Sequence, residues 1–136
     1  MKLPFFSRAK SPADPSPAAT VVQNMLRELP ELIAVAVGDV STGRTLASHT
    51  TAKGFNPAVA VTYNAAVIRE KRKATVALQL TTEHIDDILI TLTTQLHLLR
   101  VTPDGQSFLY LVVSQKEINL AIARAVLRQQ AELFAQ

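Results

Sequence analysis

The sequence contains no cysteine, no tryptophan and only four glycines. Without cysteine the chain has no disulfide framework, no thiolate ligand for a metal and no thiol nucleophile. The glycines stand apart at positions 38, 43, 54 and 105, so none belongs to a glycine-rich loop that cradles phosphate groups. We therefore expect any connection with nucleotides to run through another protein that binds them.

Long apolar runs are missing as well. No run approaches the roughly 18–20 residues that a membrane-spanning helix needs. The apolar stretch within Met1–Phe6 is shorter than the roughly 7–15 residues of a secretion signal. These absences predict a cytoplasmic protein without integral membrane association.

Strong charge of one sign is absent from most of the chain. Lys2, Arg8 and Lys10, against Asp14, account for two of the three net positive charges, so residues 18–136 are close to neutral. Such a surface lacks the basic footprint that is typical of nucleic-acid-binding domains. Residues 1–17 are rich in proline, which predicts a flexible tail. Because 48% of the 136 residues are apolar, residues 18–136 are predicted to form one globular domain.

Two proline-containing junctions predict where helices begin. Ser16-Pro17 places an N-cap serine before a first-turn proline, and Asn56-Pro57 repeats this arrangement with asparagine. Apolar residues at helical spacing then predict helices over residues 17–29 and 57–78. The end of the second helix is left open, because residues 75–80 also fit an extended segment.

Alternating apolar residues predict five strands, and a last helix follows them. The strands are residues 32–39, 44–50, 88–93, 96–101 and 108–113. Gly43 and Pro103-Asp104-Gly105 supply turns between neighbouring strands. Ser114 and Glu117 form an S-x-x-E capping box, which predicts a helix from there to about Phe134. The order αββαβββα predicts the α+β class, with a five-stranded antiparallel sheet and helices on both of its faces.

The width of this sheet predicts a dimer. Five strands about 4.8 Å apart make a layer roughly 24 Å wide, whereas one helix covers about 10 Å. The first and last helices can cover one face, but the middle helix leaves about half of the other face bare. A second copy is the expected cover, because two-fold homodimers are the commonest oligomers. The alternative is a monomer in which sheet twist and loop residues such as Phe55 hide the gap.

The middle helix carries two apolar stripes that could serve such a dimer. One stripe comprises Ala60, Tyr63, Val67, Ala74 and Leu78, and the other comprises Val61, Ala65, Ile68 and Val76. We predict that the second stripe, at Val61, Ala65 and Ile68, faces the second copy.

Three stretches of the chain match a known pattern: Met25–Leu29 running into Ile33–Val37 and the Gly43 turn, then Ile85–Thr91, then Gln95–Arg100 with Phe108–Val113 and the final helix. These stretches resemble the roadblock/dynein light-chain family, and more narrowly its bacterial members that partner Mgl-type small GTPases. Together they span about residues 18–134. The resemblance implies a roadblock or profilin-like sheet, dimerisation through the second helix and third strand, and a small GTPase as partner. Ile88, Leu89 and Ile90 thereby join the predicted dimer interface.

The β-hairpin departs from the pattern of this family. Val40, Ser41 and Thr42 stand between Asp39 and Gly43, where the family has an aspartate-glycine turn. No contact that depends on this turn is carried over.

Histidines and carboxylates do not form a catalytic or metal-binding pattern. His49, His84 and His97 are never paired at helical spacing or grouped with acidic residues. His97 is interpreted as a partly buried structural imidazole. Asp86 and Asp87 are neighbours at the entry to a predicted strand, so they point to opposite faces and do not share a site. Solvation of the strand entry or protection of an edge strand is the better interpretation. We expect no metal, no cofactor and no enzymatic activity.

A basic run on the middle helix is the remaining candidate for a functional site. Arg69, Arg72 and Lys73 are predicted to contact a partner, in a run that also holds Lys71 and is interrupted by Glu70. Alternatively, the run binds a nucleic-acid backbone or anionic lipid, or it is only a solvated face of the helix. Nucleic acid is disfavoured, because no aromatic residue interleaves with these charges.

The sequence therefore predicts a non-catalytic, homodimeric interaction protein that acts as scaffold or regulator of a small GTPase or related NTPase. A second hypothesis is a small-molecule sensor domain of profilin-like or GAF-like build. That function would require a cavity bordered by polar groups.

Overall fold

The computed structural model describes residues 16–116 and 118–135. Its elements are α2 (Pro17–Glu28), β1 (Ala34–Asp39), β2 (Thr45–Thr50), α3 (Pro57–Ala77), β3 (Asp87–Thr91), β4 (Gln95–Val101), β5 (Ser107–Ser114) and α4 (Leu120–Phe134). This order confirms the prediction αββαβββα. The predicted tail falls mainly on residues 1–15, which lie outside the described residues. Among the described residues, no helix is both long enough and apolar enough to cross a membrane.

The five strands form one antiparallel sheet in the order β2-β1-β5-β4-β3. β5 lies at the centre and has apolar side chains on both faces, all of them buried from Phe108 to Val113. A strand of this composition needs cover on both sides. β2 and β3 are the two outer strands of the sheet.

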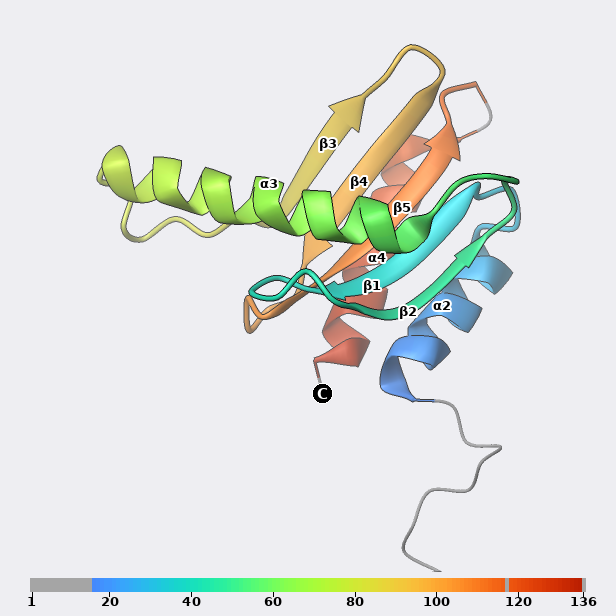
Figure 1. Ribbon diagram of the computed structural model, residues 1–136, viewed down its shortest axis with the longest axis horizontal. Helices are drawn as coiled ribbons and strands as arrows, with labels where there is room; N and C mark the ends of the chain where they lie inside the picture. The colour runs from blue at the N-terminus through green and yellow to red at the C-terminus, as the bar shows by residue number, and fades with distance from the viewer. Residues whose placement is uncertain (1–15, 117, 136) are drawn as a thin grey trace, which may run out of the picture.

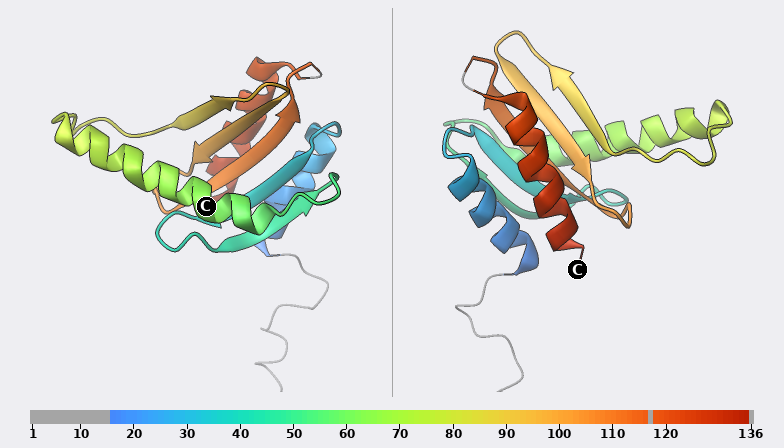
Figure 2. Two further views of the ribbon diagram at one scale, coloured as in Figure 1. Left: turned by 45° about the horizontal axis from the view of Figure 1, so that its top comes forward. Right: turned by 180° about the vertical axis from the view of Figure 1, so that it is seen from behind.

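Helices cover the two faces of the sheet unequally, as Figures 1 and 2 show. α2 and α4 lie side by side on one face, where Met25, Leu98, Leu111 and Leu127 belong to one buried cluster. On the other face α3 packs alone, mainly over β1 and β2. Its C-terminal half runs on past the β3 edge of the sheet (Figure 1). The predicted imbalance between the two faces is therefore confirmed.

The predicted starts of α2 and α3 are confirmed by their capping contacts. The Ser16 hydroxyl accepts a hydrogen bond from the backbone N–H of Ala19 at 3.0 Å. The Asn56 side chain accepts hydrogen bonds from Ala58 at 3.0 Å and Val59 at 3.4 Å. α3 ends at Ala77, with Leu78 as its C-cap, so residues 75–77 are helical rather than extended.

The predicted start of the last helix is wrong. Ser114 is the final residue of β5 and pairs with Gln95 of β4, and Gln115 and Lys116 form a turn rather than the first residues of a helix. α4 begins at Leu120, and its N-cap is Asn119, whose side chain accepts a hydrogen bond from Ile122 N–H at 3.2 Å. The other half of the expected capping box, Glu117, lies outside the described residues.

A glycine allows α3 to lie close to the sheet. A Cβ atom on Gly38 would stand 2.6 Å from Val61 Cγ1 of α3 and 2.9 Å from the Phe108 ring. Both distances are shorter than real carbon–carbon contacts, so only glycine fits at this position without displacing its neighbours. The packing of α3 against β1 and β5 depends on this position.

Candidate partner-binding surface

One stripe of α3 faces the sheet of its own chain. Val61, Ala65 and Ile68 are fully buried there, in the same cluster as Leu99, Phe108 and Val112. Side chains that are already covered within one chain have no surface left to offer a second copy. The stripe that we predicted to face a second copy therefore packs against its own sheet, and the other stripe is the one available to a partner.

The outward stripe of α3 is exposed and apolar. Tyr63 is 71% exposed and Leu78 is 65% exposed. Val59, before Tyr63 in the helix, and Val67, between Tyr63 and Leu78, are exposed as well. A shallow hollow of about 590 Å³ lies along this stripe. It is lined by Tyr63, Ala66, Val67, Glu70, Lys71 and Ala74. Clustered apolar side chains of this kind are typical of sites that bind another protein.

The projecting end of α3 adds two more exposed apolar side chains, Val76 and Leu80, beside Leu78. Val76 is 69% exposed, and Leu78 and Leu80 lie just beyond it. Val76 was placed with the inward stripe by its spacing, but the sheet ends before α3 reaches this residue. Gln79 has a φ of 61°, and Leu80 N–H closes the helix by donating to the Thr75 carbonyl at 2.9 Å. This turn holds Leu78 and Leu80 at the tip of the projection.

The predicted interface residues of β3 lie on an outer strand. Ile88 and Ile90 pair with Leu99 and His97 of β4, and Leu89 pairs with Leu98. All three are half-buried. Ile88 packs against the α3-side cluster, whereas Leu89 packs against the α2–α4 cluster. Within the described residues, the other edge of β3 has no neighbouring strand, and these three residues stay a prediction for a dimer interface.

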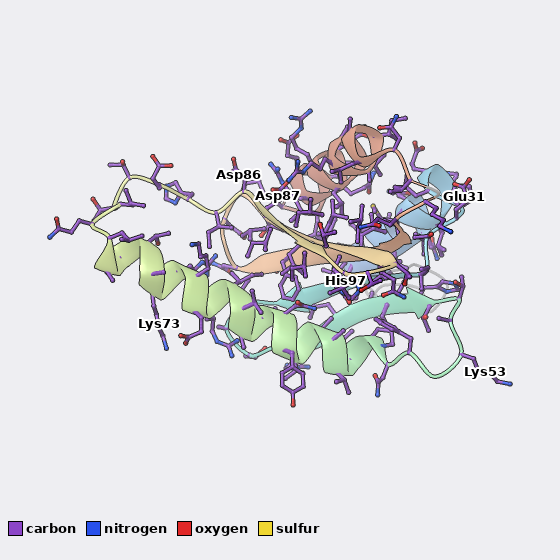
Figure 3. All side chains as sticks on the ribbon, turned by 90° about the horizontal axis from the view of Figure 1, so that it is seen from above. Glu31, Lys53, Lys73, Asp86, Asp87 and His97 are labelled. Atoms are coloured by element: carbon purple, nitrogen blue, oxygen red, sulfur yellow. The ribbon has the colours of Figure 1, made fainter. Side chains whose placement is uncertain are left out.

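A cluster of hydrogen-bonded polar side chains lies on the part of the sheet that α3 leaves uncovered. His97 Nδ1 is 3.0 Å from the Tyr110 hydroxyl, and His97 Nε2 is 2.9 Å from Gln95 Oε1. Burial lowers the pKa of His97 and raises the pKa of Tyr110 to about 12, against the opposite effect of a hydrogen bond from Asn64. His97 is thus a hydrogen-bonded, half-buried imidazole, as the sequence predicted (Figure 3).

The predicted partner-binding residues of the basic run are engaged within the chain. Arg69 Nη1 donates to the Val40 carbonyl at 2.7 Å, and Arg72 Nη2 donates to the Gly105 carbonyl at 2.6 Å. These two side chains hold α3 to the ends of neighbouring strands. Lys73 points away from the sheet (Figure 3) and forms an ion pair with Glu70 at 2.8 Å. Both members of that pair are well exposed, so it adds little to stability.

Asp86 and Asp87 lie where β3 begins (Figure 3). Asp87 forms an ion pair with Arg124 of α4, with Nε 3.0 Å from Oδ2. The Asp86 carbonyl accepts a hydrogen bond from Val101 N–H at 3.1 Å. Asp87 thus ties β3 to α4, a structural role that agrees with its expected place at the start of the strand.

A cavity beside the β4–β5 turn does not resemble a metabolite site. Its volume is about 660 Å³, and it lies where the segment between α3 and β3 passes the β4–β5 turn. Charged side chains line much of it: Arg72, Glu83, Asp86, Arg100, Asp104, Arg128 and Glu132. Ligand pockets are mostly apolar with a few polar groups. Within the same described part of the chain, no three metal-ligating side chains come together.

The chain has the fold of the roadblock domains. It is similar to the Roadblock/LC7 domain from Streptomyces avermitilis, with a TM-score of 0.69 and 11% identity, over 83% of this chain and 90% of that chain. The resemblance that the sequence carries is thereby confirmed, and at this identity it establishes the fold.

Two MglB proteins share this fold with the chain. MglB of Myxococcus xanthus matches with a TM-score of 0.70 and 9% identity, over 84% of this chain and 90% of that one. The gliding protein MglB of Thermus thermophilus matches with a TM-score of 0.69 and 18% identity, over 93% of this chain and 96% of that one. No family model and no curated protein matches the sequence.

Proposed function

We propose that this protein is a non-catalytic, homodimeric interaction protein of the cytoplasm that regulates a small GTPase or a related NTPase. The observation that carries the proposal is the shape of the α3 layer. α3 covers β1 and β2, leaves part of β3 and β4 open, and projects past the β3 edge with apolar side chains exposed.

A two-fold dimer accounts for these three features together. If the β3 edges of two copies lie side by side, the projecting end of each α3 passes over the sheet of the other copy. Val76, Leu78 and Leu80 then meet the open face near Ile90 and His97 of the partner. Removing exposed apolar side chains from water is the main favourable contribution in most protein associations. The same arrangement pairs the unpaired edges of the two β3 strands.

The proposed GTPase partner is supported by the fold and by the remaining outward stripe. The solved structures that share this fold include MglB proteins, and the resemblance in sequence is to bacterial roadblock proteins that partner Mgl-type GTPases. In the proposed dimer two copies of the stripe around Tyr63 and Val67 lie on one side of the joined sheet. Aromatic and aliphatic anchors of this kind commonly supply most of the binding energy of an interface.

The dimer is tested by measuring molecular mass in solution for the protein and two variants. We expect the wild type to have twice the mass of one chain, and Leu78→Asp to have the mass of one chain. Leu78 is exposed, so this change leaves the folded single chain intact. Ile122→Asp is the matched control, because Ile122 is an equally apolar, exposed residue on α4, on the opposite face. A monomeric wild type at high concentration contradicts the dimer, and a dimeric Leu78→Asp or a monomeric Ile122→Asp contradicts this interface.

The partner is tested by comparing the proteins that co-purify with the wild type and with Tyr63→Ala. We expect a GTPase or related NTPase that is retained by the wild type and lost with the variant. With that NTPase purified, the nucleotide hydrolysis or exchange rate should change on addition of the wild type. If no nucleotide-binding protein depends on Tyr63, or its rates do not change, the regulatory function is contradicted.

A further inference from the structure

β2 forms an edge of the sheet that the proposed dimer does not use. It pairs with β1 alone, and no described strand lies on its other side. Thr51 N–H donates to the Ile33 carbonyl of the neighbouring segment at 2.8 Å. Because backbone groups alternate along a strand, His49 and Ala47 also face β1, and the N–H groups of Ser48 and Thr50 point outward. The outward edge therefore presents unpaired backbone donors and acceptors.

Side chains that usually protect a free edge are absent from β2, although its register against β1 shifts once, between Val37 and Gly38. Natural edge strands are commonly blocked by lysine, proline or a charged side chain within the strand. The β2 sequence is Thr-Leu-Ala-Ser-His-Thr, which contains no lysine, arginine, proline or acidic residue. Leu46 is 42% exposed and is the extra residue where the register of β2 against β1 shifts, and the neighbouring Ala47 packs against the α2–α4 cluster. A strand laid along β2 would find both backbone partners and an apolar contact.

The charge around β2 indicates what such a strand would carry. From position 40 to position 69 the sequence has no aspartate or glutamate. Arg44, His49 and Lys53 are exposed along and beside β2, and Lys53 extends into solvent in Figure 3. The acidic residues that flank this stretch in the sequence are already engaged: Asp39 accepts hydrogen bonds from Ser41 and Thr42, and Glu70 pairs with Lys73. Arg44 and Lys53 outnumber Glu31, the one acidic residue of the neighbouring segment that bonds Thr51, so the edge has a small net positive charge, and a second β2 would bring like charges together.

We propose that β2 is a docking edge, which takes an acidic, extended segment of a partner protein as a sixth strand. Main-chain hydrogen bonds would hold the segment in register, and its acidic side chains would meet Arg44, His49 and Lys53. In the proposed dimer the two β2 edges lie at the far ends of the joined sheet. Each copy thus offers this edge whether or not its α3 stripe is occupied, which gives the protein a second class of partner.

The edge is tested with a proline substitution that removes one outward donor. Ser48→Pro deletes an N–H that has no partner within the sheet, so we expect the fold to be retained, and Ser48→Ala is the control that keeps the N–H. The probe is a fluorescein-labelled peptide of alternating glutamate and valine, and its anisotropy reports binding to the full chain. We expect the wild type and Ser48→Ala to bind alike and Ser48→Pro to bind at least about tenfold more weakly.

Two further arms separate backbone pairing from charge. A peptide of alternating lysine and valine should not bind, and Arg44→Glu combined with Lys53→Glu should weaken the glutamate peptide. Amide hydrogen exchange at Ser48 and Thr50 of the wild type should slow when the glutamate peptide is added, a readout that does not depend on how the proline variant folds. Equal binding of both peptides, no protection at these amides, or peptide-driven growth into larger assemblies overturns the proposal.

Failure of this edge is distinguishable from failure of the dimer. Leu78→Asp lies at the opposite side of the sheet from β2, so this variant should still bind the glutamate peptide even as a single chain. Loss of binding in Leu78→Asp would show that the peptide occupies the α3 projection instead, and would overturn the assignment to β2.

Discussion

At the scale of single residues, Gly38 shows how one missing side chain sets the distance between two layers. Any Cβ at this position meets Val61 and Phe108 well inside contact distance. The sequence marks Gly38 only as an isolated glycine in an apolar strand. Its role comes from the approach of α3, which is far from it in the sequence.

Gly38→Ala should destabilise the protein by about 1–3 kcal/mol, because a packed interior accommodates an extra methyl group only by shifting its neighbours. Urea unfolding of the two proteins measures this difference. In a Val61→Ala background the same substitution should cost less, since one of the two clashes has been removed. An equal cost in both backgrounds would show that the contact with Val61 is not the cause.

His97 gives a second prediction, on the dependence of stability on pH. Burial lowers the pKa of His97 below its usual value of 6.5, so the unfolded chain takes up the proton more readily than the folded one. The contribution of His97 is therefore fully present above pH 6.5 and is lost as the pH falls through the pKa of the folded state.

The free energy of unfolding, measured from a pH of about 7.5 down to about 5, should fall more for the wild type than for His97→Gln. Asp39 and Asp104, whose pKa values are lowered by hydrogen bonds, lose their contributions only at lower pH, below the usual value of 3.8. Parallel curves for the two proteins would show that His97 is solvated in the folded state.

At the scale of elements, the C-terminal end of β5 shows why a local sequence motif can mislead. Ser114-x-x-Glu117 has the spacing of a capping box, yet Ser114 continues the ladder with Gln95. Pairing in a sheet involves residues that are distant in sequence, so a local pattern carries no information about where the pairing stops. The serine and asparagine at the starts of α2 and α3 were predictable, because a proline directly after each of them fixes the helix start.

Asn119→Ala should therefore destabilise the protein by about 1 kcal/mol, the usual cost of losing an N-cap side chain. Ser114→Ala should cost clearly less, since the Ser114 hydroxyl accepts only a long hydrogen bond of 3.3 Å from Lys116 N–H. Thermal or urea unfolding of both variants decides between the two caps. A larger effect at Ser114 would restore the earlier start of the last helix.

At the scale of the whole molecule, the three helices within the described residues are distributed unequally over the two faces of the five-stranded sheet. α2 and α4 share one face, and α3 alone serves the other while extending beyond it. The same asymmetry was expected from strand spacing and helix width. The stripe of α3 that faces the sheet was not expected, because both stripes are apolar and their helical spacing does not show which one is buried.

A dimer of this kind should unfold at a temperature that depends on protein concentration. For the wild type we expect the midpoint to rise by about 2–4 °C for each tenfold increase in concentration, because unfolding releases two chains. Leu78→Asp should show no such dependence. A concentration-independent midpoint for the wild type would mean that folded single chains separate before they unfold, or that no dimer exists.

The sequence by itself determined the element order, the fold class, two of the three helix starts and the half-buried state of His97. These features follow from local spacing, from proline and glycine chemistry, and from the need to cover apolar strands. Only the tertiary structure decided that Val61, Ala65 and Ile68 face inward, that Arg69 and Arg72 bind carbonyl groups of their own chain, and that β2 is left as a positive edge. Each of these depends on contacts between segments far apart in the sequence, which local patterns do not encode.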